Sequence, residues 1–178
     1  MNPTASSHHA LHAYNVNPNA RFETQSPTER VILLLRAHPF TQIPWVVNTG
    51  FLVLLLIVAD FFIPLVLTGP QILFLNVFSI VFIISYAWIN FLHWFFNVGL
   101  VTNERIVDID FSQIIYKEVT ATKLEKVEDV TSKSAGYFGS LFNYGDVFVQ
   151  TAGTEVNIEF IEIPRPGDVV GIINELGG

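Results

Sequence analysis

The sequence divides into a long apolar stretch and a following region in which polar and apolar positions alternate. Between Arg36 and Glu104 the single charged side chain is Asp60. Apolar runs of about 18 or more residues with few charges are typical of membrane-spanning helices. The first region is therefore predicted to lie in a membrane, and the second to form a sheet.

Two helices are expected in the apolar stretch, at residues 43–67 and 71–96, separated by Thr68-Gly69-Pro70. Glycine readily adopts the positive φ that ends a helix, and proline is favoured in the first turn of the next one. At about 1.5 Å per residue each helix is about 37–39 Å long, enough to cross a hydrocarbon core of about 30 Å. Because the turn is short, residues 43–96 are predicted to form a transmembrane helical hairpin.

The basic residues indicate how this hairpin is oriented. Three arginines precede the first helix, six Lys or Arg residues follow the second, and the turn has none. Basic residues are enriched on the cytoplasmic side of membrane proteins, and aromatic belts mark the interfaces. Trp45, Trp88 and Trp94 fit such a belt on the same side. We expect a multi-pass protein of the inner cell membrane, with both termini cytoplasmic and the lipid bilayer as its surroundings.

Polar residues inside the hairpin are candidates for a function. Residues whose numbers sum to about 138 lie at equal depth, which pairs Asn48 with Asn90 and brings Asp60 within reach of Asn76 or Ser79. Such groups form interhelical hydrogen bonds, or else a proton or ion pathway in a small subunit of a transport complex. Hydrogen bonding is favoured, because one acid without a second ionisable group at depth is a poor relay.

The first 25 residues are rich in Asn, Ser, His, Pro and Ala without periodicity, and residues 1–25 are predicted to be a disordered tail. His8, His9 and His12 raise the alternative of a metal-binding tract. A flexible tail without a second ligand cluster is a weak metal site. We therefore expect no bound metal.

Residues 26–42 are expected to form a juxtamembrane segment. Ser26-Pro27-Thr28-Glu29 has the pattern of a capping box with proline at the first helical position. The apolar run of residues 30–36 is too short to span a membrane, so it is predicted to lie at the interface with its arginines reaching water. A short strand added to the downstream domain is the competing interpretation, because residues 31–35 are apolar enough for either.

From residue 97 to the end the pattern is typical of strands followed by one helix. Val169, Ile173 and Leu176 belong to an apolar stripe on a helix that Pro166 opens. This order predicts a small sandwich or barrel closed by the helix, so the fold class is an α+β membrane protein with a cytoplasmic domain at residues 97–178. The expected strands are residues 98–101, 105–111, 114–120, 123–132, 146–151 and 155–163.

An aromatic segment punctuated by glycines, from Gly136 to Gly145, interrupts the strands. It lacks the Lys and the helix-opening Ser or Thr of a phosphate-binding loop. Its aromatic side chains suit a protein contact, with the alternative that half of them face the core. The candidate interface residues are Tyr137, Phe138, Phe142 and Tyr144.

Three motifs together carry a resemblance to a known family. They are Val101-Thr102-Asn103-Glu104-Arg105-Ile106-Val107-Asp108 directly after a membrane helix, Val127-Glu128-Asp129-Val130, and the run from Gly136 through Gly145-Asp146-Val147 to Thr151-Ala152-Gly153. Over roughly residues 30–176 the chain resembles the bacterial pleckstrin-homology (PH) domain family in its membrane-anchored, YdbS-like form. The resemblance implies a seven-strand, bent β-sandwich closed by a C-terminal helix. It also implies no enzymatic activity and a role as a scaffold or interaction module.

Charge and composition limit the classes of partner and of site that this chain is expected to have. The chain has a net charge of −7, so nucleic acid, which needs clustered Lys and Arg, is not expected. The six basic and thirteen acidic residues of positions 97–178 give that region a net charge of −7 as well, which makes phosphoinositide binding unlikely on electrostatic grounds. The absence of cysteine excludes a disulfide scaffold and a thiol nucleophile.

No catalytic constellation is visible in the sequence, so we expect neither an enzyme nor a cofactor. The leading hypothesis is a membrane-anchored interaction or scaffold module that binds a protein partner or a second copy of itself. The alternatives are a membrane-lipid-binding or sensing module, and a small subunit of a transport complex that uses Asp60.

Overall fold

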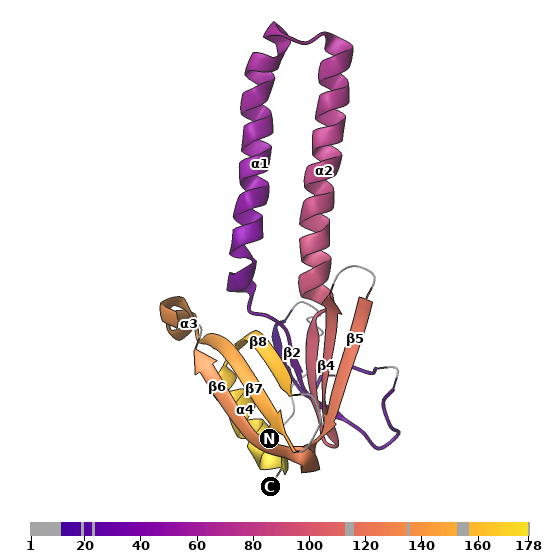
Figure 1. Ribbon diagram of the computed structural model, residues 1–178, viewed down its shortest axis with the longest axis vertical. Coiled ribbons are helices and arrows are strands. Elements are labelled where there is room, and N and C mark those ends of the chain that lie inside the picture. The colour runs from indigo at the N-terminus through magenta and orange to yellow at the C-terminus, as the bar shows by residue number, and fades with distance from the viewer. Residues whose placement is uncertain are drawn as a thin grey trace, which may run out of the picture.

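The computed structural model places two long helices side by side on a small β-sandwich (Figure 1). The structure describes residues 12–18, 20–22, 24–112, 116–134, 136–152 and 157–177. Residues 1–11, and the expected strand starts at 114–115 and 155–156, lie outside the described residues.

The two helices are α1 (Ile43–Phe62) and α2 (Gly69–Phe96), with a 3₁₀ turn, η2, at Ile63–Leu65. The first ends earlier than the expected residue 67 because Pro64, which has no backbone N–H, falls in the 3₁₀ turn. Thr68 and Gln71 form the capping box that starts α2, where the Thr68 amide donates to Gln71 Oε1 at 3.0 Å. Both helices are long and apolar enough to cross a membrane, and almost none of their residues is buried inside the protein.

The sandwich consists of two antiparallel sheets. The first has the order β1-β2-β3-β4-β5 and the second β6-β7-β8. The strands are β1 (Tyr14–Val16), β2 (Val31–Leu35), β3 (Val98–Thr102), β4 (Arg105–Ser112), β5 (Tyr116–Lys123), β6 (Val127–Ser134), β7 (Tyr144–Thr151) and β8 (Ile158–Pro164). As the alternation predicts, the described strands after α2 number six, all close to their expected positions.

The helices are inserted between two neighbouring strands of one sheet. β2 ends just before α1, β3 begins just after α2, and the two pair antiparallel with Leu35 opposite Gly99 and Leu34 opposite Leu100. The prediction that residues 30–36 lie at the membrane interface is therefore wrong, and the competing strand interpretation holds. The partner of this strand is more than 60 positions away in the sequence, which local patterns do not reveal.

The first sheet also corrects the expected tail and domain boundary. β1 pairs with β2, Tyr14 opposite Leu35, so part of the segment predicted to be disordered is an edge strand. A domain that begins at residue 97 would lack β1 and β2. Ser26–Glu29 keeps the capping-box hydrogen bond, because the Ser26 amide donates to Glu29 Oε2 at 3.0 Å, yet it forms a turn that leads into β2 and starts no helix.

The main core fills the space between the sheets and is closed by α4 (Pro166–Gly177). Val169 and Ile173 of this helix are buried, as the apolar stripe predicts. Gly99 of β3 faces Phe160 of β8, and a Cβ at position 99 would collide with that ring. The core side chains from the strands include Leu33, Leu35, Val101, Ile106, Val130, Val147, Val149, Ile158, Phe160 and Ile163.

The aromatic segment between β6 and β7, expected as a loop, contains a short helix, α3 (Gly136–Phe142). Gly136, its first residue, and Asn143, which follows its last, have positive φ values of 67° and 53°. Glycine and asparagine tolerate this left-handed conformation best. In Figure 1, α3 stands apart from the core near the base of α1.

Candidate functional site: the junction of helices and sandwich

A buried carboxylate fixes the segment before the helices to the first strand pair after them. Glu29 is 3% exposed, and its Oε1 lies 2.9 Å from Arg105 Nε. Thr102 Oγ1 donates to the same oxygen at 2.9 Å, and Arg105 Nη2 donates to Oε2 at 3.1 Å. Burial alone would raise the pKa of Glu29, but the hydrogen bonds from Arg105, Ser26 and Thr102 lower it below its ordinary value.

The rest of the Val101–Asp108 motif holds the same segment. Asn103 Oδ1 accepts from the Arg30 amide at 2.6 Å, and the Asn103 amide donates to the Arg30 carbonyl at 3.1 Å. Thr28 Oγ1 donates to Glu104 Oε1 at 2.9 Å. The β3–β4 turn therefore holds residues 24–30 in place. Arg105, the single basic residue of this turn, is already paired with a carboxylate.

A second set of contacts joins the helix bases to the sandwich. Arg36 Nε donates to the Phe95 carbonyl at 3.0 Å, and its guanidinium lies 4.8 Å from the centre of the Phe95 ring. Trp94 Nε1 donates to the Ala37 carbonyl at 2.8 Å. The His38 amide donates to the Glu162 carbonyl at 2.7 Å, which ties the start of the helical region to β8. These bonds hold the helices and the sandwich together.

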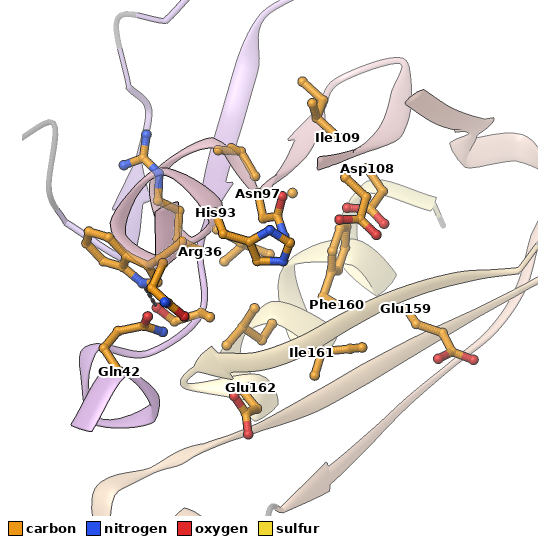
Figure 2. Close-up of a pocket in the computed structure, with 18 residues that line it drawn as sticks. Arg36, Gln42, His93, Asn97, Asp108, Ile109, Glu159, Phe160, Ile161 and Glu162 are labelled. Atoms are coloured by element: carbon orange, nitrogen blue, oxygen red, sulfur yellow. Dashed lines mark hydrogen bonds between the residues drawn. The ribbon is translucent and has the colours of Figure 1, made fainter. Parts of the chain in front are cut away.

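A pocket of about 410 Å³ lies at this junction. Figure 2 shows the His93 side chain in the middle of its lining, with Asp108 and Phe160 toward one side and Arg36 toward the other. The acidic residues of the lining come from β4 and β8 and are Asp108, Asp110, Glu159 and Glu162. The pocket thus combines an excess of acids with apolar walls.

The pKa of Asp108 is shifted by its surroundings. Burial, with added repulsion from Asp110 and Glu118, raises the pKa of Asp108 to about 6. The carboxylate therefore takes up a proton as the pH falls through about 6 and is mostly ionised above pH 7. Among the described residues, no group of three or more His, Asp or Glu side chains is placed to hold a metal ion. No local pattern in the sequence indicates this pocket, because its lining comes from segments far apart in the chain.

The four candidate interface residues separate into two groups. Tyr137, Phe138 and Phe142 are 80%, 57% and 42% exposed, whereas Tyr144 is 8% exposed. Tyr144 stacks on the His38 ring at 5.3 Å between centroids, so it belongs to the packed interior. Leu141, at 63% exposed, completes the apolar face of α3, and the aromatic pattern of the segment does not indicate this aliphatic residue.

Phe40 connects this face to the helices. It lies in η1 (Pro39–Gln42), the 3₁₀ turn that leads into α1. Its ring stacks on Phe142 at 4.2 Å and lies 5.9 Å from Phe138, measured between centroids. The exposed side chains of α3 are therefore next to the N-terminal end of α1.

Of the polar residues in the hairpin, one expected pair is present. Asn76 Nδ2 donates to Asp60 Oδ1 at 2.9 Å. Asn90 Nδ2 instead donates to the Tyr86 carbonyl of its own helix at 2.8 Å, and Asn48 is exposed. The expected pairing of Asn48 with Asn90 is therefore not the arrangement in the structure. His8 and His9 of the tail lie outside the described residues.

Comparison with known protein families identifies the family of this chain. The Bacterial PH domain family matches residues 40–177, more than half of the chain. The chain belongs to this family. In this bacterial PH protein the match includes both helices and the strands that follow them, whereas β1 and β2 precede it. No protein with curated annotation matches the chain.

Two solved structures are similar to parts of this bacterial PH protein. A pleckstrin homology domain from Shewanella amazonensis SB2B is 17% identical, with a TM-score of 0.33, over 45% of this chain and 63% of that one. A DUF1696 family protein with a pleckstrin-homology domain from Shewanella loihica PV-4 is 20% identical, with a TM-score of 0.34, over 46% and 71%. The chain thus spans less than two thirds of the first of these structures.

Proposed function

We propose that the protein is a non-enzymatic, membrane-anchored PH module of the YdbS-like form that presents its sandwich to the cytoplasm as an interaction or scaffold surface. The insertion of α1 and α2 between β2 and β3 carries this proposal. Two exposed apolar helices that leave and re-enter one sheet position the sandwich directly at the bilayer surface. The basic residues at this end favour the cytoplasmic side.

The partner is a protein or a second copy of the chain. Arg105, the base of the first hairpin turn after the helices, is paired with Glu29, and the chain from residue 97 onward has a net charge of −7. Both observations disfavour an anionic lipid head group as the ligand, including phosphoinositides. The acidic lining of the junction pocket favours a protein segment that carries basic side chains.

Asp60 has a structural role in this proposal. It lies in the last turn of α1 and accepts a hydrogen bond from Asn76, which is the pattern of interhelical pairing. A transport role would need further ionisable groups at greater depth, and the other charged residues of the chain flank the helices.

Single cysteines test the anchoring and orientation, because the natural chain has none. Val66→Cys places a thiol in the exposed turn between the helices, and Glu128→Cys places one on β6. A membrane-impermeant maleimide should label position 66 in intact spheroplasts and position 128 only after lysis. Labelling of position 128 in intact spheroplasts, or release of the protein by alkaline carbonate, would contradict the proposal.

Crosslinking in native membranes tests the partner. A lysine-reactive crosslinker followed by purification of the chain should recover a defined protein, or a dimer of the chain, whose yield falls as salt is raised. Recovery of the chain alone at every salt concentration, together with salt-sensitive flotation on anionic liposomes, would favour the lipid-sensing alternative instead.

A further inference from the structure

The apolar face of α3 is exposed without charged neighbours in its own segment. Tyr137, Phe138 and Leu141 are 80%, 57% and 63% exposed, and the sequence from Gly136 to Gly145 contains no charged residue. Large side chains that are this exposed and adjacent to one another mark a surface that contacts an apolar partner.

The polar groups of this short helix are satisfied locally. Ser134 and Ser140 share a hydrogen bond of 2.9 Å between their hydroxyls, and Ser140 Oγ also contacts the Gly136 carbonyl at 3.1 Å. These bonds secure the attachment of α3 to β6. The helix can therefore present aromatic and aliphatic side chains outward while its serine hydroxyl is hydrogen-bonded.

The position of α3 indicates what covers this face. Phe40, which stacks on Phe142, lies inside the first segment able to span a membrane, Pro39–Leu65. Val46 and Val47, one to two turns further along α1, are 50% and 61% exposed. The apolar face of α3 thus lies beside the N-terminal end of this first apolar span, as its place near the base of α1 in Figure 1 also indicates.

We propose that α3 inserts into the interfacial layer of the cytoplasmic leaflet and is a third, non-spanning contact between the sandwich and the bilayer. This inference rests on the proposed membrane anchoring. Tyr and Phe are suited to the head-group region, where a polar tip or ring edge meets water and the ring meets acyl chains. With α1 and α2, this contact fixes the tilt of the sandwich relative to the membrane.

Lipid-depth quenching of the full chain tests the inference. Leu141→Cys is labelled with the fluorophore NBD and the protein is reconstituted in phosphatidylcholine–phosphatidylglycerol vesicles containing doxyl lipids. Glu128→Cys on β6 is the matched control on the same sandwich, and Leu55→Cys in the middle of α1 reports insertion of the hairpin.

A lipid doxylated near the head group should quench the label at position 141 at least twofold more than the label at position 128. The label at position 141 should also show a blue-shifted emission and reduced access to aqueous iodide. The label at position 55 should be quenched by a lipid doxylated deep in the acyl chain, whatever the result at position 141.

The outcomes separate the two proposals. If position 55 is quenched and position 141 resembles position 128, α3 does not contact the bilayer and this inference is wrong. If position 141 is protected from iodide without lipid quenching, and the label self-quenches as protein density rises, a second copy of the chain covers α3 instead. If position 55 is not quenched, the membrane anchoring itself fails.

Discussion

Arg105 grips the buried carboxylate of Glu29 through two nitrogens, with Nε 2.9 Å from Oε1 and Nη2 3.1 Å from Oε2. One partner precedes the helices and the other follows them. A charge-assisted bidentate pair of this kind is stronger than a neutral hydrogen bond and has a defined geometry. The pair therefore holds together two parts of the chain that the helical hairpin separates.

Removal of this carboxylate should destabilise the sandwich. Glu29→Ala removes the carboxylate that Arg105 and Thr102 share as an acceptor and should lower the free energy of unfolding by about 2–4 kcal/mol. Thermal unfolding in detergent measures the loss. In the double variant Glu29→Ala/Arg105→Ala the two losses should not add, because both changes break the same pair. An unchanged unfolding temperature for Glu29→Ala would contradict this account.

The junction of β2 and β3 predicts that the sandwich folds without the helices if the strands are reconnected. Because Leu35 is opposite Gly99, Arg36 and Val98 can be joined by a two-residue Asn-Gly turn, the favoured chemistry for a tight hairpin. This shortened chain should be monomeric, soluble and cooperatively folded by circular dichroism. A fragment of residues 97–178, which lacks β2, is the matched comparison and should be unfolded or aggregated.

The raised pKa of Asp108 predicts that the stability of the fold depends on pH with a definite sign. Its pKa in the folded protein, about 6, exceeds the ordinary value of 3.8, so the folded state binds more protons than the unfolded state between these values. Asp108 therefore costs stability at neutral pH, and this cost is relieved as the pH falls through 6.

Asp108→Asn should raise the free energy of unfolding at pH 7.5 by an amount on the order of 1 kcal/mol. At pH 5 the variant and the natural protein should differ less. Unfolding temperatures of both proteins at the two pH values measure the effect. His38 titrates oppositely, since burial lowers its pKa, but it is common to both proteins and cancels in the comparison. A variant that is less stable at pH 7.5 would overturn this prediction.

Position 99 requires glycine because the backbone there closely approaches the ring of Phe160. Gly99→Ala should cost about 1–3 kcal/mol, because the added methyl group forces the ring from its place in the core. Gly171→Ala on α4 is the matched control: its Cβ meets nothing within 4 Å, and alanine favours the helix. Phe160→Leu should recover part of the Gly99→Ala loss. Equal stability of the two alanine variants would contradict the proposed collision.

The hydrogen bond between Asn76 and Asp60 predicts that position 60 tolerates any substitution that keeps an oxygen acceptor. Asp60→Asn keeps an oxygen acceptor for Asn76, so membrane abundance and any transport-linked phenotype should be unchanged. Asp60→Val removes the acceptor and should weaken helix pairing by about 0.6–2 kcal/mol, measured by unfolding in detergent. Collapse of abundance in the Asn variant alone would indicate that the charge itself is needed.

The local pattern of residues predicts an element correctly where that element depends on neighbours in the sequence. Alternation in β4, the proline that opens α4 and the apolar length of α1 and α2 each indicated the element that forms. β2 was ambiguous because five apolar residues suit a strand or an interface equally, and only β3 decides between them. Ser26–Glu29 misled because the same hydrogen bond can start a helix or close a turn.

Less of the candidate site than of the fold could be predicted from the sequence. Tyr137, Phe138 and Phe142 were identified from composition, but their neighbour Phe40 is nearly 100 residues away. Tyr144 was assigned with them and is buried, because β7 begins one residue after the turn at Asn143. The junction pocket depends on β8 returning beside the base of α2, which no motif encodes.

The placement of the hairpin inside a sheet has a consequence for biosynthesis. β2 leaves the ribosome first, yet its neighbour β3 is made only after both helices have been synthesised. The pairing of β2 with β3 therefore cannot form until the whole hairpin has been synthesised. Until then β2 has β1 as its strand partner and its other edge stays open, so assembly of the sandwich follows completion of the hairpin.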